Sequence, residues 1–141
     1  MALTDLTAVE AVTAMRKGEL RCEEYARALL DRATALANLN AFRILDRERV
    51  VERAREADAA RAAGKPMGRL HGLPIPVKDS INTRELPTTN GTRGLADFRP
   101  REDAEVLKPL LREGAIVMGK TNLHELSRGW TSNNGGLSTT A

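Results

Sequence analysis

The sequence has little cysteine, few aromatic residues and no long hydrophobic run. Its single cysteine, Cys22, cannot form an internal disulfide, which excludes a disulfide scaffold and favours a reducing compartment such as the cytoplasm. No stretch approaches the roughly 20 consecutive apolar residues that span a bilayer, and the N-terminus lacks a basic segment followed by an apolar one. The sequence therefore predicts neither a membrane span nor an export signal.

An excess of charge of one sign is also missing. Lysine and arginine total 22 against 19 aspartate and glutamate, and the two signs alternate along the chain. Nucleic-acid binders gather basic residues on one face and interleave them with aromatic residues, which make up only 3% of this sequence. We therefore expect a mixed, solvated surface, with no direct nucleic-acid partner and no membrane partner.

What is present suits one globular domain or part of one. The 141 residues, 41% of them hydrophobic, are enough for one hydrophobic core and too few for two typical ones. Composition changes at Gly64, after which glycine and proline become frequent and helical periodicity gives way to short apolar runs. We predict an α/β fold with a mainly helical part at 1–64 and a strand-helix-strand part at 65–141.

The mainly helical part begins with a capping-box pattern, in which Thr7 is followed three residues later by Glu10. Apolar residues then recur at helical spacing until Gly18, which predicts that the first helix ends there. The elements expected after it are a helix at 22–37, a strand at 41–45 and a solvent-facing helix at 47–63. The apolar face predicted for the second helix consists of Tyr25, Leu29, Ala33 and Leu36.

The second part predicts a βαβ unit, with strands at 73–77 and 115–118 and a helix at 103–113 between them. Two strands joined by such a crossover are expected to be parallel, and the crossover to be right-handed. Pro109 falls inside the expected helix, where it would remove one backbone hydrogen bond or bend the helix.

Four residues match the pattern of a phosphate-binding loop: Gly114, Gly119, Lys120 and Thr121. Such a loop follows a strand and precedes a helix, so that backbone N–H groups and the helix N-terminus face the phosphates. Here a helix is expected before the pattern, and the residues inside it form the predicted strand at 115–118. We instead interpret Gly114 as the left-handed residue that ends a helix, and Gly119 as part of a turn after the strand.

Lys78 comes directly after the apolar strand at 73–77, at the sheet edge where open α/β folds place their sites. An amine held there among apolar neighbours can be kept neutral and act as a general base. Asp79 is expected to point to the opposite face, because side chains alternate along a strand. The alternative interpretation of Lys78 is an ordinary solvated lysine at a strand end.

Four segments carry a resemblance to a known family. They read GRLHGLPIPVKD at 68–79, LPTTNGT at 86–92, DA at 103–104 and GAIVMGKTNLHE at 114–125. In this order and spacing they resemble the N-terminal part of the amidase signature family, and the helices before them resemble that family's N-terminal helices. The resemblance implies that residues 1–141 are the N-terminal part of a single amidase-signature domain, whose mixed sheet is flanked by helices.

The resemblance also implies an activity and a role for Lys78. In the family, the matching lysine is the base of a Ser-cisSer-Lys triad that hydrolyses a small-molecule amide. The neutral amine takes a proton through a bridging serine and activates a nucleophilic serine; an acyl-enzyme forms, and water then releases the carboxylic acid. No metal or organic cofactor is implied. Aryl-acyl amides, small dicarboxylic monoamides and urea-like compounds all stay open as substrates.

Neither of the family's serine segments is present. The segment GGLSTT at 135–140 is superficially similar to one of them, but a leucine interrupts it. The chain therefore carries one triad member of three, and we expect it to be inactive alone. A homo-oligomer or a complementing C-terminal segment is expected to cover its open sheet edges. The alternatives to an amidase are a subunit that releases ammonia from glutamine for tRNA-dependent amidation and a non-catalytic interaction module.

Several other polar or aromatic residues are candidates for a site. Thr131 and Ser132 lie in a polar loop that either contacts the substrate, since binding residues favour loops, or forms a turn in which these side chains satisfy their own backbone. The single tryptophan, Trp130, is expected to pack in a core. No metal-ligand spacing is found among His71, His124, Glu125 and Cys22.

Overall fold

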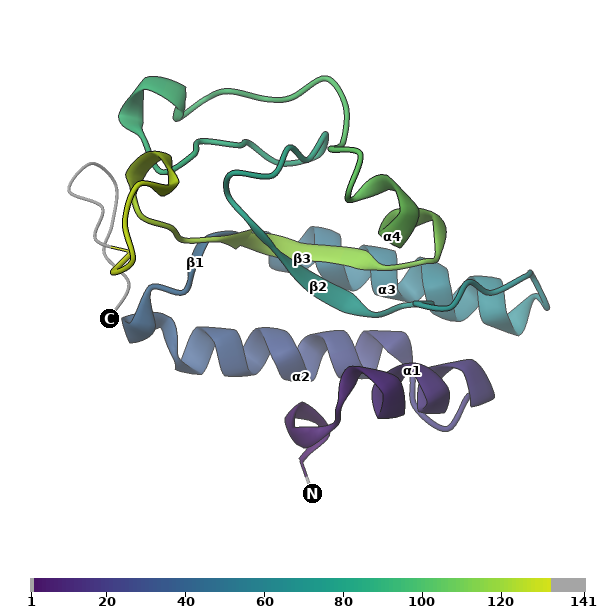
Figure 1. Cartoon of the computed structure of the whole chain (residues 1–141). Helices are drawn as coiled ribbons and strands as arrows, with labels where there is room; N and C mark the ends of the chain where they lie inside the picture. The colour runs from purple at the N-terminus through teal and green to yellow at the C-terminus, as the bar shows by residue number, and fades with distance from the viewer. Residues whose placement is uncertain (1, 133–141) are drawn as a thin grey trace. The chain divides into compact units, whose positions relative to one another are not determined.

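The computed structural model describes residues 2–132, in which four α-helices and three β-strands are found (Figure 1). In chain order they are α1 (Ala8–Lys17), α2 (Cys22–Ala35), β1 (Phe42–Leu45), α3 (Arg47–Ala62), β2 (Pro74–Lys78), α4 (Lys108–Arg112) and β3 (Ile116–Thr121). Short 3-10 turns lie at Leu3–Asp5, Ala37–Leu39, Arg93–Leu95 and Glu125–Ser127.

The chain divides into two compact units. Of the described residues, the first unit comprises 2–35, 46–75 and 109–118, and the second comprises 36–45, 76–108 and 119–132. Helices α1, α2 and α3 belong to the first unit and β1 to the second, whereas β2 and β3 each contribute residues to both.

Helix α1 begins and ends where its sequence predicts. The Thr7 side chain accepts the backbone N–H of Glu10 at 3.3 Å, and the Glu10 carboxylate accepts the backbone N–H of Thr7 at 2.8 Å. This reciprocal pair satisfies donors that the first turn of a helix leaves unpaired. At the other end, Gly18 adopts φ 78°, the left-handed conformation that closes a helix.

Helix α2 packs against α3 in the first unit. The residues that α2 buries there differ in part from the apolar face predicted for it. Leu29 is only half-buried and Leu36 lies beyond the end of the helix, 41% exposed. The predicted apolar face of α2 is therefore wrong at these two positions. The position of the neighbouring helix, as well as helical spacing, determines which residues of α2 are buried. The residues that α2 buries are Cys22, Tyr25, Ala26 and Leu30, and those that α3 buries are Val50, Val51 and Ala54.

Helix α4 is shorter than the helix predicted at 103–113. The Asp103 carboxylate accepts the backbone N–H of Arg84 at 2.8 Å, and Ala104 N–H donates to the Asn82 carbonyl at 2.9 Å. Residues 103–104 are therefore bound to another loop and do not start a helix. Pro109 then falls in the first turn of α4, where its missing N–H costs no intrahelical hydrogen bond.

The three strands are ordered β1-β3-β2 in one sheet. β1 is antiparallel to β3, with Ile44 opposite Lys120 and Leu45 opposite Gly119. Along β2 and β3 the hydrogen bonds advance in the same direction, from Ile116 N–H to the Leu73 carbonyl and from Asp79 N–H to the Thr121 carbonyl. This advance makes β2 and β3 parallel, as the predicted βαβ unit requires.

The region that matched a phosphate-binding loop is a strand. Residues 115–120 are all buried, and β3 begins at Ile116, so no loop lies inside the pattern. Gly114 has φ 92° after α4, as predicted. Gly119 corrects the prediction, since it lies within β3 and not in a turn. A Cβ atom there would collide with the Ile44 carbonyl, so glycine allows β1 to approach β3.

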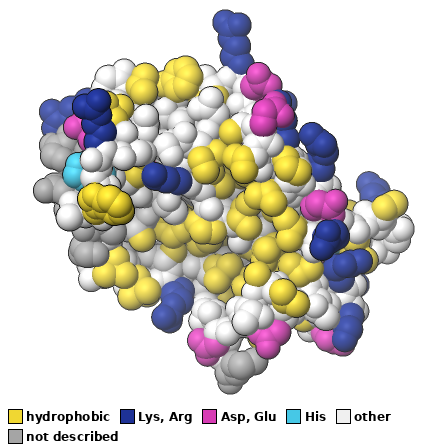
Figure 2. Space-filling view, viewed as in Figure 1, with side chains coloured by type: hydrophobic (Ala, Val, Ile, Leu, Met, Phe, Trp, Pro, Cys, Tyr) yellow, Lys and Arg dark blue, Asp and Glu magenta, His cyan; other side chains and the backbone are white. Residues whose placement is uncertain are grey.

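Figure 2 shows charged side chains of both signs, most of them near the edge of the face, and hydrophobic side chains gathered in its middle. None of the helices within residues 2–132 has the length and the hydropathy that a membrane crossing requires.

Candidate functional site

Lys78 is the last residue of β2, and its side chain is exposed. Val77 and Asp79 on either side of it are buried, so the alternation predicted for this strand end is found. The Lys78 carbonyl accepts the N–H of Ile81 at 2.9 Å, which turns the chain directly after the strand. Within the described residues Lys78 is exposed and pairs with no carboxylate, so the interpretation of an amine held among apolar neighbours is not found there.

Asp79 lies on the other side of the strand and is completely buried. Its carboxylate accepts the backbone N–H of Thr89 at 3.1 Å and also the Thr89 hydroxyl. Two cations flank it, Arg43 Nε at 3.4 Å and Lys120 Nζ at 3.4 Å. The buried negative charge is thereby both paired and hydrogen-bonded, as an ion away from water must be.

Lys120 on β3 is the other fully buried charge of this cluster. Besides Asp79, four oxygen atoms lie within hydrogen-bonding distance of its Nζ atom. They are the Thr88 hydroxyl at 2.7 Å, the Ile81 carbonyl at 2.9 Å, the Pro87 carbonyl at 3.1 Å and the Thr83 hydroxyl at 3.3 Å. Burial lowers the pKa of Lys120 from its ordinary value, and the adjacent Asp79 carboxylate opposes that shift.

The sequence pattern indicates Lys120 only as a phosphate ligand and does not reveal this buried cluster. The partners of Lys120 lie 32 to 41 residues away along the chain, so no local spacing points to them. One signal is available: a lysine that continues a buried apolar strand needs a carboxylate or several acceptors to compensate its charge. The nearby threonines at 83, 88 and 89 are suitable acceptors.

The other candidate residues lie close to the end of the described chain. Thr131 is exposed and Ser132 is half-buried. Trp130 is fully exposed, so the expectation that it packs in a core is wrong within the described residues. The interpretation of segment 135–140 falls outside the described residues.

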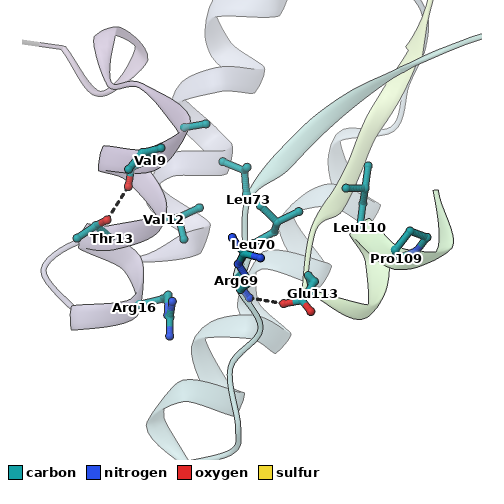
Figure 3. A pocket seen from close by; sticks show the side chains of 11 residues that line it. Val9, Val12, Thr13, Arg16, Arg69, Leu70, Leu73, Pro109, Leu110 and Glu113 are labelled. Atoms are coloured by element: carbon teal, nitrogen blue, oxygen red, sulfur yellow. Dashed lines mark hydrogen bonds between the residues drawn. The ribbon is translucent and has the colours of Figure 1, made fainter. Parts of the chain in front are cut away.

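A separate groove of about 500 Å³ lies within the first unit (Figure 3). Arg16, Arg69 and Glu113 supply its charged side chains, and the backbone N–H of Arg69 donates to the Glu113 carboxylate at 2.6 Å. Lys78 and Lys120 are not among the residues that line it. Its apolar lining includes Val9, Val12, Leu70, Leu73 and Leu110.

Comparison with known families finds a family model that matches most of the chain. The family model described as Amidase matches residues 24–141, which include the Lys78 strand end and the Lys120 strand. The chain belongs to the amidase family. Its resemblance to the amidase signature, inferred from four sequence segments, is thus confirmed.

Relatives within the amidase family are found by sequence and by structure. The chain is 41% identical over 128 residues to a glutamyl-tRNA(Gln) amidotransferase subunit of Salinispora arenicola, a match that covers 90% of the chain and 26% of that protein. A structure described as fatty acid amide hydrolase superposes with a TM-score of 0.90 at 28% identity, covering 99% of this chain and 25% of that one. The native peptide amidase of Stenotrophomonas maltophilia gives 0.79 at 35% identity, with 86% and 25% covered.

The amidase relatives confirm the predicted α/β fold class and show what share of an amidase this chain covers. The three-stranded mixed sheet and its helices superpose on amidase folds over most of this chain. The chain spans about a quarter of the length of the relatives it matches.

Proposed function

We propose that the polypeptide carrying this chain hydrolyses a carboxylic amide to an acid and ammonia or an amine, with Lys78 as the base. The observation that carries this proposal is the placement of Lys78. In a chain of the amidase family, its amine stands at the end of β2, exposed and without an ion-pair partner among the described residues. Such an amine is accessible to a serine hydroxyl supplied from elsewhere in the polypeptide.

The proposed chemistry follows the Ser-cisSer-Lys order. The Lys78 amine takes the proton of a bridging serine, which takes the proton of a nucleophilic serine as that oxygen attacks the amide carbon. The C–N bond then breaks, the leaving nitrogen is protonated by the same relay, and water hydrolyses the acyl-enzyme. Lys78 therefore acts as base and then as acid, and no metal ion or organic cofactor is required by these steps.

The two serines belong to the remainder of the fold in this proposal, so the 141 residues are inactive alone. We assign residues 1–141 to the N-terminal part of a single amidase-signature domain, completed by a C-terminal segment or by assembly into an oligomer. Large apolar side chains exposed within the described residues support such a covering partner, among them Val9, Val106 and Trp130. A buried, unpaired Cys22 is compatible with the reducing cytoplasm.

The substrate class has two candidates within this chemistry. A simple amidase takes a small amide, and Thr131 and Ser132 are the residues of this chain that we assign to substrate contact. The second candidate is glutamine hydrolysis that supplies ammonia to a partner. It is favoured by the relatives described as glutamyl-tRNA(Gln) amidotransferase subunits, with 41% identity for the relative from Salinispora arenicola. A non-catalytic interaction module is the remaining alternative.

Ammonia release tests these alternatives. The natural polypeptide that carries this chain is incubated with aryl-acyl amides, dicarboxylic monoamides and glutamine, and the ammonia or amine released is measured with and without candidate partner subunits. Release from small amides without a partner supports a simple amidase, whereas release from glutamine that depends on a partner supports the amidotransferase role. If no amide yields ammonia or an amine under any of these conditions, the hydrolase proposal is wrong and the interaction module takes its place.

A further inference from the structure

The buried ammonium of Lys120 binds the segment that directly follows Lys78. Its carbonyl partners are Ile81 at 2.9 Å and Pro87 at 3.1 Å, and its hydroxyl partners are Thr83 and Thr88. A single side chain on β3 therefore contacts both ends of the loop at 81–88. All of these residues belong to the second unit.

The hydroxyl partners show that Lys120 acts as a donor. The Thr83 hydroxyl donates to the Leu86 carbonyl at 3.1 Å, and the Thr88 hydroxyl donates to the Ile81 carbonyl at 3.3 Å. Each hydroxyl has one proton and has thus used it, so each faces Lys120 as an acceptor. Carbonyl oxygens only accept. The surroundings therefore fit an ammonium with three protons, further compensated by the Asp79 carboxylate at 3.4 Å.

Two short paths of hydrogen bonds lead from Lys120 to the backbone of Lys78. In the first, Lys120 donates to the Ile81 carbonyl and the Ile81 N–H donates to the Lys78 carbonyl at 2.9 Å. In the second, the N–H of Asp79 donates at 3.1 Å to the carbonyl of Thr121, the residue after Lys120. Both hydrogen bonds hold the peptide unit between Lys78 and Asp79, at the end of β2.

We propose that Lys120 is a positioning residue for Lys78, whose buried ammonium ties the 81–88 loop and Asp79 together and so fixes the strand end that presents the Lys78 amine. The proposal rests on the function proposed above for Lys78. It gives Lys120 no contact with the substrate, because its side chain is completely buried. Displacement of a reacting group by about 1 Å can lower the rate about 10²-fold, so a misplaced Lys78 amine should be detectable as a lower kcat.

The test compares four variants of the natural polypeptide. Lys120→Met keeps the apolar stem and removes the donors, and Thr88→Val, a milder change, removes one acceptor from a side chain of the same shape. Lys65→Met is the control, since Lys65 is an exposed lysine of the first unit. Lys78→Ala is the reference for loss of the base. For each, kcat and KM are determined per folded molecule, and amide hydrogen exchange is followed residue by residue.

We expect Lys120→Met to lower kcat by about 10²-fold with KM changed less than about twofold, because the base is misplaced while substrate contacts persist. Thr88→Val is expected to lower kcat by about tenfold, and Lys65→Met to leave kcat unchanged. Amides of 79–92 should exchange at least about tenfold faster in Lys120→Met, while amides of α2 and α3 keep their protection. A purely structural role would reduce the folded fraction without lowering kcat per folded molecule.

Three outcomes overturn the proposal. If exchange at 79–92 is unchanged in both Lys120→Met and Thr88→Val, Lys120 does not organise the loop. If exchange rises but kcat holds while Lys78→Ala is inactive, the loop does not position Lys78. Should Lys78→Ala keep full activity, the proposed function fails, and the link from Lys120 to Lys78 is overturned with it. If Lys120→Met does not fold, the kcat and the hydrogen exchange of Thr88→Val alone decide whether the proposal holds.

Discussion

The Asp58 carboxylate on α3 accepts the backbone N–H of Cys22, the first residue of α2, at 2.8 Å. Its other oxygen accepts the N–H of Glu23 at 3.0 Å. Asp58, 36 positions away in the sequence, thus caps the N-terminus of α2, because it accepts hydrogen bonds from N–H groups that the first turn leaves unpaired. The α2–α3 pair is thereby held by two hydrogen bonds to a charged group as well as by apolar contact.

Asp58→Ala should therefore destabilise the first unit. Hydrogen bonds to a charged group contribute about 1.5–3 kcal/mol each, and two are lost together, so we expect a loss of about 3–6 kcal/mol in the free energy of unfolding. Chemical denaturation followed by circular dichroism measures it. The matched control is Asp31→Ala, which removes an exposed ion pair with Arg47 and should leave the midpoint nearly unchanged. Equal effects of the two variants would contradict this assignment.

The thiol of Cys22 should be unreactive in the folded chain. Burial and the adjacent Asp58 carboxylate raise the pKa of Cys22 from 9.0 to about 12. Because the thiolate is the reactive form, its fraction near neutral pH is about 10³-fold lower than in the unfolded chain. Iodoacetamide labelling followed by mass spectrometry should show slow modification in buffer and fast modification in denaturant. Rapid labelling of the folded chain would show that Cys22 is accessible.

Stability should fall as the pH drops below about 6.5. Burial lowers the pKa of His71 from its ordinary value of 6.5, so the unfolded chain binds a proton that the folded chain does not. Stability is then full above that value and is lost as the pH falls toward the lower folded pKa. Melting temperatures between pH 8 and pH 5 measure this slope. His71→Leu should flatten it, and an unchanged slope in that variant would assign the effect to other groups.

Local features of the fold could be predicted from the sequence. The reciprocal hydrogen bonds of Thr7 and Glu10 and the left-handed Gly18 involve residues close together in the chain, and both ends of α1 follow from them. The strand that ends at Lys78 is likewise indicated by its apolar run and by the polar residues after it. These signals lie within a few residues of the elements they define.

Features set by distant residues could not be predicted in this way. The N-terminal part of the expected helix at 103–113 is bound instead by the backbone of Asn82 and Arg84. The cluster around Lys120 joins β3 to Asp79 and to a loop more than 30 residues earlier in the chain. Spacing along the chain carries no record of such contacts, so the sequence does not predict the buried cluster around Lys120.

The measurement that tests the central claim most directly is the rate of amide hydrolysis by Lys78→Ala, with Lys65→Ala as the exposed-lysine control. Both are made in the natural polypeptide that carries this chain. Loss of a general base should lower kcat/KM by about 10³-fold or more, while the exposed position keeps the free energy of unfolding within about 0.5 kcal/mol. Lys65→Ala should match the unaltered polypeptide. If Lys78→Ala hydrolyses the amide as fast as that polypeptide, Lys78 is a solvated strand-end lysine and not the base.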